Sequence, residues 1–353
     1  MSKFFSEKFS ALTPYTPGEQ PKTRKFVKLN TNESPFNPAP KVQEKVAEAS
    51  LNLQLYSDIE CTELKKKAAE IYGIKESEIL FTNGSDEILN FAFMAFCDEK
   101  TPAAFADITY GFYPVFAAIN RIPYVTIPLR EDFSINVEDY IGIGKTIFIA
   151  NPNAPTGIAL PLRDIRRIVE GNPDNVVVVD EAYVDFGGES AVNLIHEYKN
   201  LLVAQTFSKS RSLAGGRLGY GIACEELIRD LNTIKFSTNP YNVSTLTQAA
   251  GLGALESEDY TRRNCEIIRE NREYTMAELR KLGFTMTPSK SNFIFAKSDR
   301  IDGETLYLKL KEQGVLVRHF SAERIKDYNR ITVGTREQMD VLLTEIKKIT
   351  GVE

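Results

Sequence analysis

Histidine and cysteine are scarce in this sequence, which limits the kinds of site it can build. Only two of the 353 residues are histidines, too few for a histidine-based metal centre or triad. The four cysteines lack paired spacing, which disfavours a disulfide framework and a thiolate metal site. They are Cys61, Cys97, Cys224 and Cys265. We therefore expect core thiols and no bound metal.

Long apolar runs and a surplus of basic residues are missing as well. No run of about 18 apolar residues occurs, the length that a membrane span needs. The N-terminus lacks the charged and apolar blocks of a signal peptide. The net charge is -5 with both signs interspersed, whereas a nucleic-acid binder needs a basic face. We expect a cytoplasmic protein that binds a small molecule, with neither membrane nor nucleic acid as partner.

Glycine loops that bind nucleotide phosphates are also absent. No Gly-x-Gly-x-x-Gly follows a predicted strand, and Gly-x-x-x-x-Gly-Lys-Ser/Thr does not occur. Internal repeats and low-complexity blocks are absent too. A nucleotide-binding fold with a phosphate loop is therefore not expected.

The length predicts two domains, because 353 residues exceed the usual size of one core and 42% of them are hydrophobic. The N-terminal residues are rich in Pro, Thr and Asn and lack long periodicity, as expected of an arm. The composition becomes more charged and helical near residue 236. We predict an arm at 1–40 that joins the small domain, a large domain at 41–235 and a small α+β domain at 236–353.

Short apolar runs alternate with helical patterns from residue 79 onward. Helical patterns at 86–97, 112–120 and 161–170 separate the runs. This alternation predicts the α/β class, with a mostly parallel seven-stranded sheet covered by helices. The predicted strands are 78–82, 103–107, 124–127, 146–150, 175–180, 200–205 and 219–224. The smaller domain is predicted to contain strands at 291–296, 314–317 and 330–333 and helices within 244–282, 303–313 and 337–349.

Polar residues gather where predicted strands end, which is where ligands bind in such a sheet. Gly84 and Ser85 lead into a helix, so free N–H groups and a hydroxyl suit an anion. The alternative is that Ser85 only caps the helix. Lys209 follows a later strand, with Thr206 and Arg217 nearby. These donors suit a phosphorylated aldehyde cofactor bonded to the lysine amine, and the alternative is a solvated loop.

Together these motifs resemble the fold-type I pyridoxal-phosphate aminotransferases over nearly the whole chain. The motifs are Asn83-Gly84-Ser85-Asp86, Tyr110, Asn151-Pro152-Asn153-Ala154-Pro155-Thr156-Gly157, Asp180-Glu181-Ala182-Tyr183, Ser208-Lys209 and Arg217. Flanking segments are similar to one branch, the histidinol-phosphate aminotransferases. These segments are Leu12–Tyr15, Leu29–Pro35 and Arg330–Arg336.

The resemblance implies a role for each motif residue. Lys209 would hold pyridoxal 5'-phosphate covalently and, once the substrate amine displaces it, would move a proton, and both roles require a neutral amine. Asp180 would face the pyridine nitrogen, while strand alternation sends Glu181 to the opposite face. Tyr183 would donate to the phenolic oxygen, and Tyr110 would stack on the ring. The remaining cofactor-binding residues, mostly around the phosphate, would be Gly84, Ser85, Asp86, Thr206, Ser208 and Arg217.

Two further positions carry expectations from the family. A tyrosine at the position of Tyr56 reaches the phosphate of the neighbouring subunit, which implies a homodimer with shared sites. The family usually has proline next, where this chain has Ser57. The family loop commonly reads Asn-Pro-Thr-Gly, and its asparagine, which bonds the phenolic oxygen, is replaced here by Ala154. We expect the preceding Asn153 to take over that contact.

Substrate choice would depend on the arm and the second domain. Arg330 matches the family arginine that binds the substrate carboxylate; Arg318 is a second candidate, or else a surface residue. Two guanidiniums with the Tyr15 hydroxyl suit a phosphate dianion, and Asn32 is a further candidate. We expect transamination between histidinol phosphate and 2-oxoglutarate or glutamate. The alternatives are a lyase resembling threonine-phosphate decarboxylase, an aromatic amino-acid aminotransferase, or a cofactor-binding regulator without catalysis.

Overall fold

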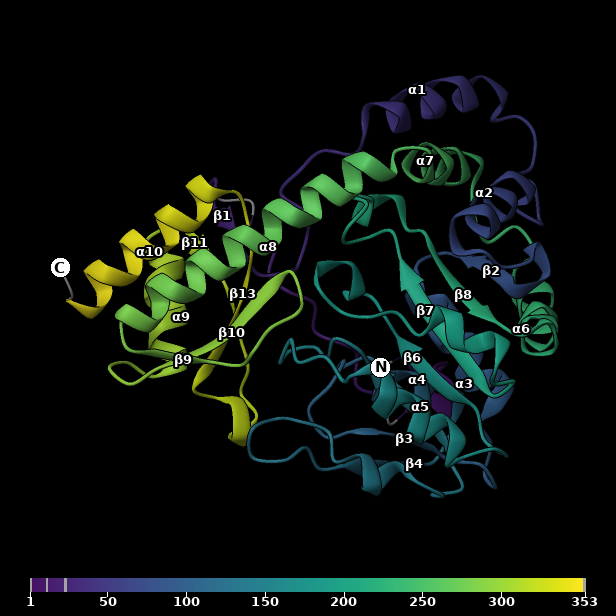
Figure 1. Ribbon diagram of the computed structural model, residues 1–353, viewed down its shortest axis with the longest axis horizontal. Helices are drawn as coiled ribbons and strands as arrows, with labels where there is room; N and C mark the ends of the chain where they lie inside the picture. Colours follow the sequence, from purple (N-terminus) through teal and green to yellow (C-terminus); the bar gives the residue numbers. More distant parts are fainter. Residues whose placement is uncertain (1, 11, 22–23, 352–353) are drawn as a thin grey trace.

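A seven-stranded sheet forms the centre of what we call the large part of the molecule (Figure 1). The computed structural model describes residues 2–10, 12–21 and 24–351. The strand order is β2-β8-β7-β6-β5-β3-β4, and all strands are parallel except β8, which is antiparallel to both neighbours. The predicted α/β class with a mostly parallel sheet is confirmed. The strands are β2 (Ile79–Thr82), β3 (Ala103–Ala106), β4 (Tyr124–Ile127), β5 (Thr146–Ala150), β6 (Val177–Asp180), β7 (Leu201–Thr206) and β8 (Gly219–Ala223).

Apolar side chains alternate between the two faces of this sheet, so helices cover both. Along β6, Val177 and Val179 belong to one core cluster and Val178 to another. The first cluster includes side chains of α1 (Pro40–Ala49), α2 (Thr62–Tyr72), α5 (Leu162–Glu170) and α7 (Thr245–Leu255). The second includes α3 (Ser85–Phe96), α4 (Tyr113–Asn120) and α6 (Glu225–Thr238). A step of one residue along β6 therefore moves a side chain to the other face.

A four-stranded antiparallel sheet, ordered β12-β13-β10-β9, forms the small part of the molecule. The N-terminal segment adds β1, which pairs in parallel with β11. The elements are β1 (Val27–Lys28), β9 (Phe284–Met286), β10 (Phe293–Ser298), β11 (Val315–Leu316), β12 (Arg318–His319), β13 (Tyr328–Thr332), α8 (Glu258–Lys281), α9 (Gly303–Glu312) and α10 (Arg336–Thr350). The sequence did not predict β1, β9 and β12, because two or three residues show no periodicity.

Helix α8 runs from the large part to the small part (Figure 1). Just before it, α7 packs closely on α1, since a Cβ at Gly253 would lie 2.7 Å from the carbonyl oxygen of Lys41. The division at 40 and 235 stays a prediction, and residues 1, 11, 22, 23, 352 and 353 of the predicted arm and small domain lie outside the described residues. Among the helices described, none combines the length and apolar character that crossing a membrane requires.

Candidate active site

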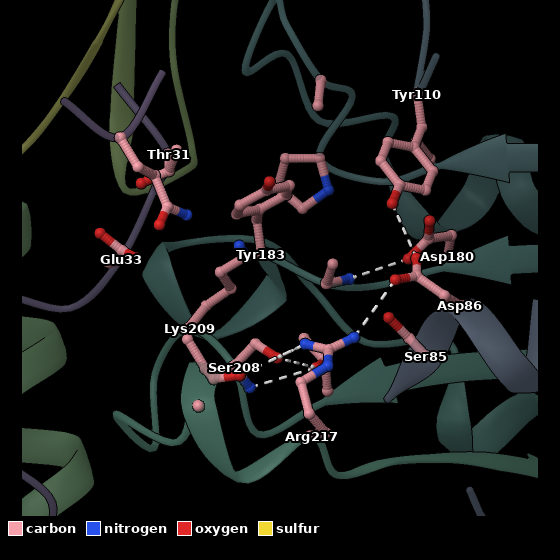
Figure 2. Close-up of a pocket in the computed structure, with 18 residues that line it drawn as sticks. Thr31, Glu33, Ser85, Asp86, Tyr110, Asp180, Tyr183, Ser208, Lys209 and Arg217 are labelled. Carbon is pink, nitrogen blue, oxygen red and sulfur yellow. Dashed lines mark hydrogen bonds and ion pairs between the residues drawn. The ribbon is translucent and has the colours of Figure 1, made fainter. Parts of the chain in front are cut away.

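A cavity of about 380 Å³ opens where the parallel strands end (Figure 2). Asp180 is the last residue of β6 and Thr206 the last of β7. Both line the cavity, and so does Lys209, which follows β7. The two strands are parallel neighbours in which Asp180 pairs with Ala204, so their ends lie side by side. The register of the sheet therefore brings the predicted carboxylate and amine into one site.

The turn between β2 and α3 forms one side of the cavity. Gly84 is the N-cap of α3, with φ 81°, and Ser85 is the first helical residue. The alternative that Ser85 caps the helix is therefore wrong. A Cβ at Gly84 would lie 2.6 Å from Nη2 of Arg217, and one at Gly219 would collide with the Ser85 backbone. Glycine at both positions lets a guanidinium and a neighbouring strand approach the helix start, whose free N–H groups suit an anion.

Hydroxyl and guanidinium donors lie beside this helix start (Figure 2). The Thr206 hydroxyl donates to Ser208 Oγ at 3.0 Å, and Arg217 Nη1 donates to the same oxygen at 3.4 Å. Arg217 Nη2 lies 3.3 Å from Asp86 Oδ2, and the Tyr110 hydroxyl donates to Asp86 Oδ1 at 2.7 Å. Two hydroxyls and a guanidinium next to free backbone N–H groups form a donor set that fits a phosphate dianion.

The Asp180 carboxylate is buried in the wall of the cavity. The Tyr113 hydroxyl donates to Oδ2 at 3.0 Å, and the Ala182 N–H donates to Oδ1 at 3.2 Å. Burial raises the pKa of Asp180 to about 6, although both hydrogen bonds act in the opposite direction. A cation in the cavity would favour the ionised form, so the site suits a protonated ring nitrogen. Sequence reasoning missed Tyr113. The only feature of the sequence that pointed to it is its position three residues after Tyr110, a spacing that can place two side chains on the same side of a helical turn.

Glu181, next to Asp180, lies on the opposite face of the sheet. Its carboxylate accepts from the Ser190 hydroxyl at 2.6 Å, the Ala191 N–H at 2.6 Å and Gln205 Nε2 at 2.8 Å. Burial raises its pKa to about 7, and it does not line the cavity. Two adjacent acids therefore have separate surroundings, as strand alternation predicts.

Lys209 points into the cavity beside Tyr183 (Figure 2). Its Nζ atom lies 5.8 Å from the centroid of the Tyr183 ring. The Tyr183 hydroxyl accepts from Asn32 Nδ2 at 3.0 Å, so a buried side chain of the N-terminal segment reaches the site. The next residue, Ser210, donates its hydroxyl hydrogen to Asp185 and so ties the Lys209 loop to the chain after β6. The N-terminal segment thus holds the Tyr183 hydroxyl, and the chain after β6 holds the loop that carries the Lys209 amine.

The side chain of Asn153 turns away from the cavity. Its Oδ1 accepts from the Thr109 hydroxyl at 2.7 Å, and its Nδ2 donates to the Ile108 carbonyl and the Thr156 hydroxyl, each at 3.0 Å. Ala154 lines the cavity and Asn153 does not. The predicted contact between Asn153 and the cofactor is therefore wrong, because loop contacts already occupy its amide.

A second cavity of about 540 Å³ adjoins the first and shares Tyr183 and Lys209 with it. Arg330 on β13 lines it, with the guanidinium 5.3 Å from the Phe293 centroid and 5.8 Å from that of Phe320. Burial lowers the pKa of Arg330, and its buried Nε has no hydrogen-bond partner within the described part of the chain. An unpaired guanidinium N–H in a cavity wall favours an anionic ligand.

The other predicted substrate residues line the same second cavity. Tyr15, Asn32 and Arg318 all border it, although they come from distant parts of the chain. Arg318 donates to the carbonyls of Thr16 and Pro17 at 3.2 and 3.3 Å, which joins β12 to the N-terminal segment. The structure therefore brings both predicted arginines and the predicted hydroxyl to one cavity.

Tyr56 lies apart from these residues. Its side chain is 84% exposed and stacks on Tyr241, with ring centroids 4.5 Å apart. It lines neither cavity. Within a single chain, Tyr56 is therefore not part of the site.

The first cavity offers partners for three functional groups of pyridoxal phosphate. An amine is present for the aldehyde, a buried carboxylate for the ring nitrogen, and hydroxyl, guanidinium and backbone N–H donors for the phosphate. A glycine at the helix start leaves room for the guanidinium. The fold and the site together define a pyridoxal-phosphate-dependent enzyme of fold type I.

The chain belongs to the class I and II aminotransferase family, whose model matches residues 24–346. It is 47% identical over 351 residues to the histidinol-phosphate aminotransferase of Brachyspira hyodysenteriae, covering 99% of each chain. The solved histidinol-phosphate aminotransferase of Sinorhizobium meliloti, in complex with pyridoxal-5'-phosphate, has a TM-score of 0.89 at 22% identity and 99% coverage of both chains. The L-threonine-O-3-phosphate decarboxylase of Porphyromonas gingivalis has a TM-score of 0.78 at 21% identity, covering 91% of this chain and 98% of that one. The protein is thus a pyridoxal-phosphate-dependent aminotransferase.

Lys209 is expected to be the lysine that takes up the cofactor, because among the described residues it is the only lysine that lines the first cavity. Borohydride reduction of the purified enzyme, followed by peptide mass mapping, should place the cofactor mass on the peptide containing Lys209. Lys209→Ala should lose this label together with the visible absorbance. A stable label on another lysine would contradict the assignment.

Asp180 and Glu181 form a matched pair for testing the carboxylate. Asp180→Asn should lower kcat by roughly a hundredfold or more, because the ring nitrogen loses its anionic partner. Glu181→Gln should cost less than about tenfold, because this side chain faces away from the cavity. Steady-state kinetics on both variants, with cofactor content measured by absorbance, decides the question. Equal losses in the two variants would show that the Asp180 assignment is mistaken.

Proposed function

We propose that this enzyme exchanges an amino group between histidinol phosphate and 2-oxoglutarate, a step of histidine biosynthesis. The observation that carries the proposal is Arg330, whose buried Nε lacks a partner among the described residues and whose side chain lines the same cavity as Arg318 and Tyr15. Two guanidiniums and a hydroxyl can bind the doubly charged phosphate of one substrate, and the same donors can bind the carboxylate of the other. The names of the 45–47% identical relatives support this substrate.

Each residue near Lys209 has one task in this proposal. Lys209 would hold the cofactor covalently until the substrate amine displaces it, and its freed Nζ atom would then move the proton of the substrate carbon. Asp180 keeps the ring nitrogen protonated, and Tyr183 donates to the phenolic oxygen. Asn32 holds the Tyr183 hydroxyl in place. When bound, pyridoxal phosphate draws electrons away from the substrate carbon that carries the amino group.

The cofactor phosphate is assigned to the start of α3. The Ser85 backbone N–H group and the side chains of Thr206, Ser208 and Arg217 would hold it. The predicted contribution of the Gly84 N–H group is wrong, because that group donates to the Thr82 carbonyl at 2.9 Å. Asp86 has a different part, because a carboxylate repels an anion. It accepts hydrogen bonds from Arg217 and Tyr110, so it orients these two side chains at the rim of the phosphate position.

Both substrates of the proposed reaction are anions, so one clamp serves both half-reactions. The Arg330 guanidinium lies over the rings of Phe293 and Phe320, and its Nη2 donates to the Asn30 carbonyl at 3.2 Å, so the side chain is held in the cavity wall. Arg318 adds a second charge on the neighbouring strand, where it pairs directly with Arg330 in the ladder. We assign Arg330 to the anion of either substrate and Arg318 to the second charge of the phosphate.

We also propose that the enzyme is a cytoplasmic homodimer with shared sites. Leu51, Leu53, Leu55 and Tyr56 are each more than half exposed and follow one another along the chain. Exposed apolar side chains that gather in this way mark an interaction surface. A second copy of the chain that covered this segment would bring Tyr56 to a site that a single chain leaves without it.

Substitution of the two arginines should separate the two substrates. Arg330→Ala and Arg318→Ala should each lower kcat/KM for histidinol phosphate by about 10- to 150-fold, or about 1.5–3 kcal/mol for a charge-assisted contact. The value for 2-oxoglutarate should depend mainly on Arg330. Arg330→Lys should restore activity only in part, since an ammonium lacks the planar fork. Arg300→Ala, on the exposed surface, is the control.

The measurement follows each half-reaction by absorbance and the products by separate assays for glutamate and carbon dioxide. Glutamate formation matched to the consumption of histidinol phosphate, without carbon dioxide, is expected for transamination. Release of carbon dioxide would instead indicate a lyase. Equal, small losses for both substrates would leave a general amino-acid aminotransferase as the better description.

Mixed dimers should show whether Tyr56 serves the neighbouring site. Tyr56→Ala and Lys209→Ala should each be weakly active or inactive alone. A dimer containing one chain of each kind keeps one complete site, so co-expression should recover up to about half of the wild-type kcat per dimer. A mixture of Lys209→Ala with Asp180→Asn is the control, because both residues come from the same chain's site. Failure of the first mixture to exceed the control would argue against shared sites.

A further inference from the structure

One arginine of the small part bonds to two loops of the large part. Arg324 lies in the 3-10 turn η8 (Glu323–Ile325), between β12 and β13. Its Nη1 donates to Asp107 Oδ2 at 2.6 Å, and its Nη2 donates to the carbonyls of Leu129 and Arg130 at 2.9 and 3.0 Å. A single guanidinium therefore joins η8 to the end of β3 and to the loop after β4.

An apolar cluster shared by both parts lies at the same interface. Ile108 and Phe133 come from the large part, and Phe295 and Ile325 come from the small part. The rings of Phe133 and Phe295 meet edge to face, with centroids 5.8 Å apart. The Arg324 guanidinium lies 5.8 Å from the Phe133 centroid. Polar and apolar contacts thus act together where the two parts meet.

This interface forms part of the wall of the substrate cavity. Asp107 and Ile325, one from each part, line the second cavity together with Arg330. Arg324 itself lines neither cavity. Asp107 lies in the loop that leads to Tyr110, and Arg324 lies in the connection that leads to β13. The contact therefore connects two segments that lead to opposite walls of the cavity.

We propose that Arg324 and Asp107 form a latch that holds the small part against the large part and so sets the position of Arg330 relative to Lys209. The inference rests on the proposed function, because it takes Arg330 as the anion-binding residue. Arg324 acts as a positioning residue through Arg330.

The shape of the guanidinium explains why an arginine occupies this place. Its planar fork reaches a carboxylate and two carbonyls at once, with directions that fix η8 on the large part. Without the fork, the small part has more orientations to lose when a substrate binds, and that loss weakens binding. Once a substrate is bound, the positions of Lys209 and Asp180 do not depend on the contact between Arg324 and Asp107. The latch therefore affects KM more than kcat.

The test compares Arg324→Ala, Arg324→Lys and Asp107→Asn with the control Lys326→Ala. Lys326 lies next to η8, and its Nζ pairs with Glu323 at 2.7 Å, so its loss removes a nearby cation outside the latch. Arg324→Ala should raise the KM for histidinol phosphate roughly tenfold, with kcat changed less than about threefold. Arg324→Lys should fall between wild type and Arg324→Ala. The double variant of Arg324→Ala with Asp107→Asn should lose little more than Arg324→Ala, because both break one contact.

Hydrogen–deuterium exchange of the holoenzyme without substrate provides a second measurement. Residues 128–135 and 318–330 should exchange faster in Arg324→Ala than in wild type or Lys326→Ala. Unchanged exchange together with an unchanged KM would overturn the latch, and so would independent, additive losses from the two latch residues. A wild-type enzyme that does not turn over histidinol phosphate would overturn the proposed function, while the exchange measurement would still decide on the latch.

Discussion

The buried carboxylate of Asp180 is the constraint on which the site depends. Burial raises its pKa to about 6, even though Tyr113 and Ala182 donate hydrogen bonds to it. A buried anion of this kind is fully stabilised only by a cation close by, and the cavity supplies the space for one. Helices on both faces of the sheet keep water away from the strand that carries it. The fold and the chemistry therefore share one requirement, a dry strand end beside an open cavity.

The site is assembled from segments that lie far apart in the chain. Parallel register places the ends of β6 and β7 together, and the N-terminal segment then closes the site from the other side. Asn32 contacts both parts of the molecule. Its backbone N–H donates to the Thr332 hydroxyl of the small part, and its side-chain Nδ2 donates to the Tyr183 hydroxyl of the large part. The arm thus links the sheet of the small part to the phenol beside Lys209. Its position affects cofactor and substrate alike.

The fold alone does not choose the reaction, because solved neighbours with TM-scores of 0.89 and 0.78 include an aminotransferase and a decarboxylase. The choice is made by side chains around a common cavity. Here Ala154 lines the cavity where the family has an asparagine, and Asn153 is held by Thr109. The proposed mechanism therefore assigns the contact with the phenolic oxygen to Tyr183. In the proposed function, arginines of the small part select the substrate, and their placement depends on how the two parts meet.

The sequence by itself determined which segments form the strands of the large sheet and which polar residues lie at their ends. All seven strands of the large sheet could be predicted. Six of them are buried along their length, and the edge strand β4, although mostly exposed, is rich in β-branched and aromatic residues. Alternation along β6 separated Asp180 from Glu181 in advance. Only the tertiary structure decided which polar groups are free. Asn153 is adjacent to the site in sequence, yet local contacts consume its amide, and Tyr113 reaches Asp180 from another element. Hydrogen-bond partners are chosen by packing in three dimensions, so spacing along the chain could not reveal them.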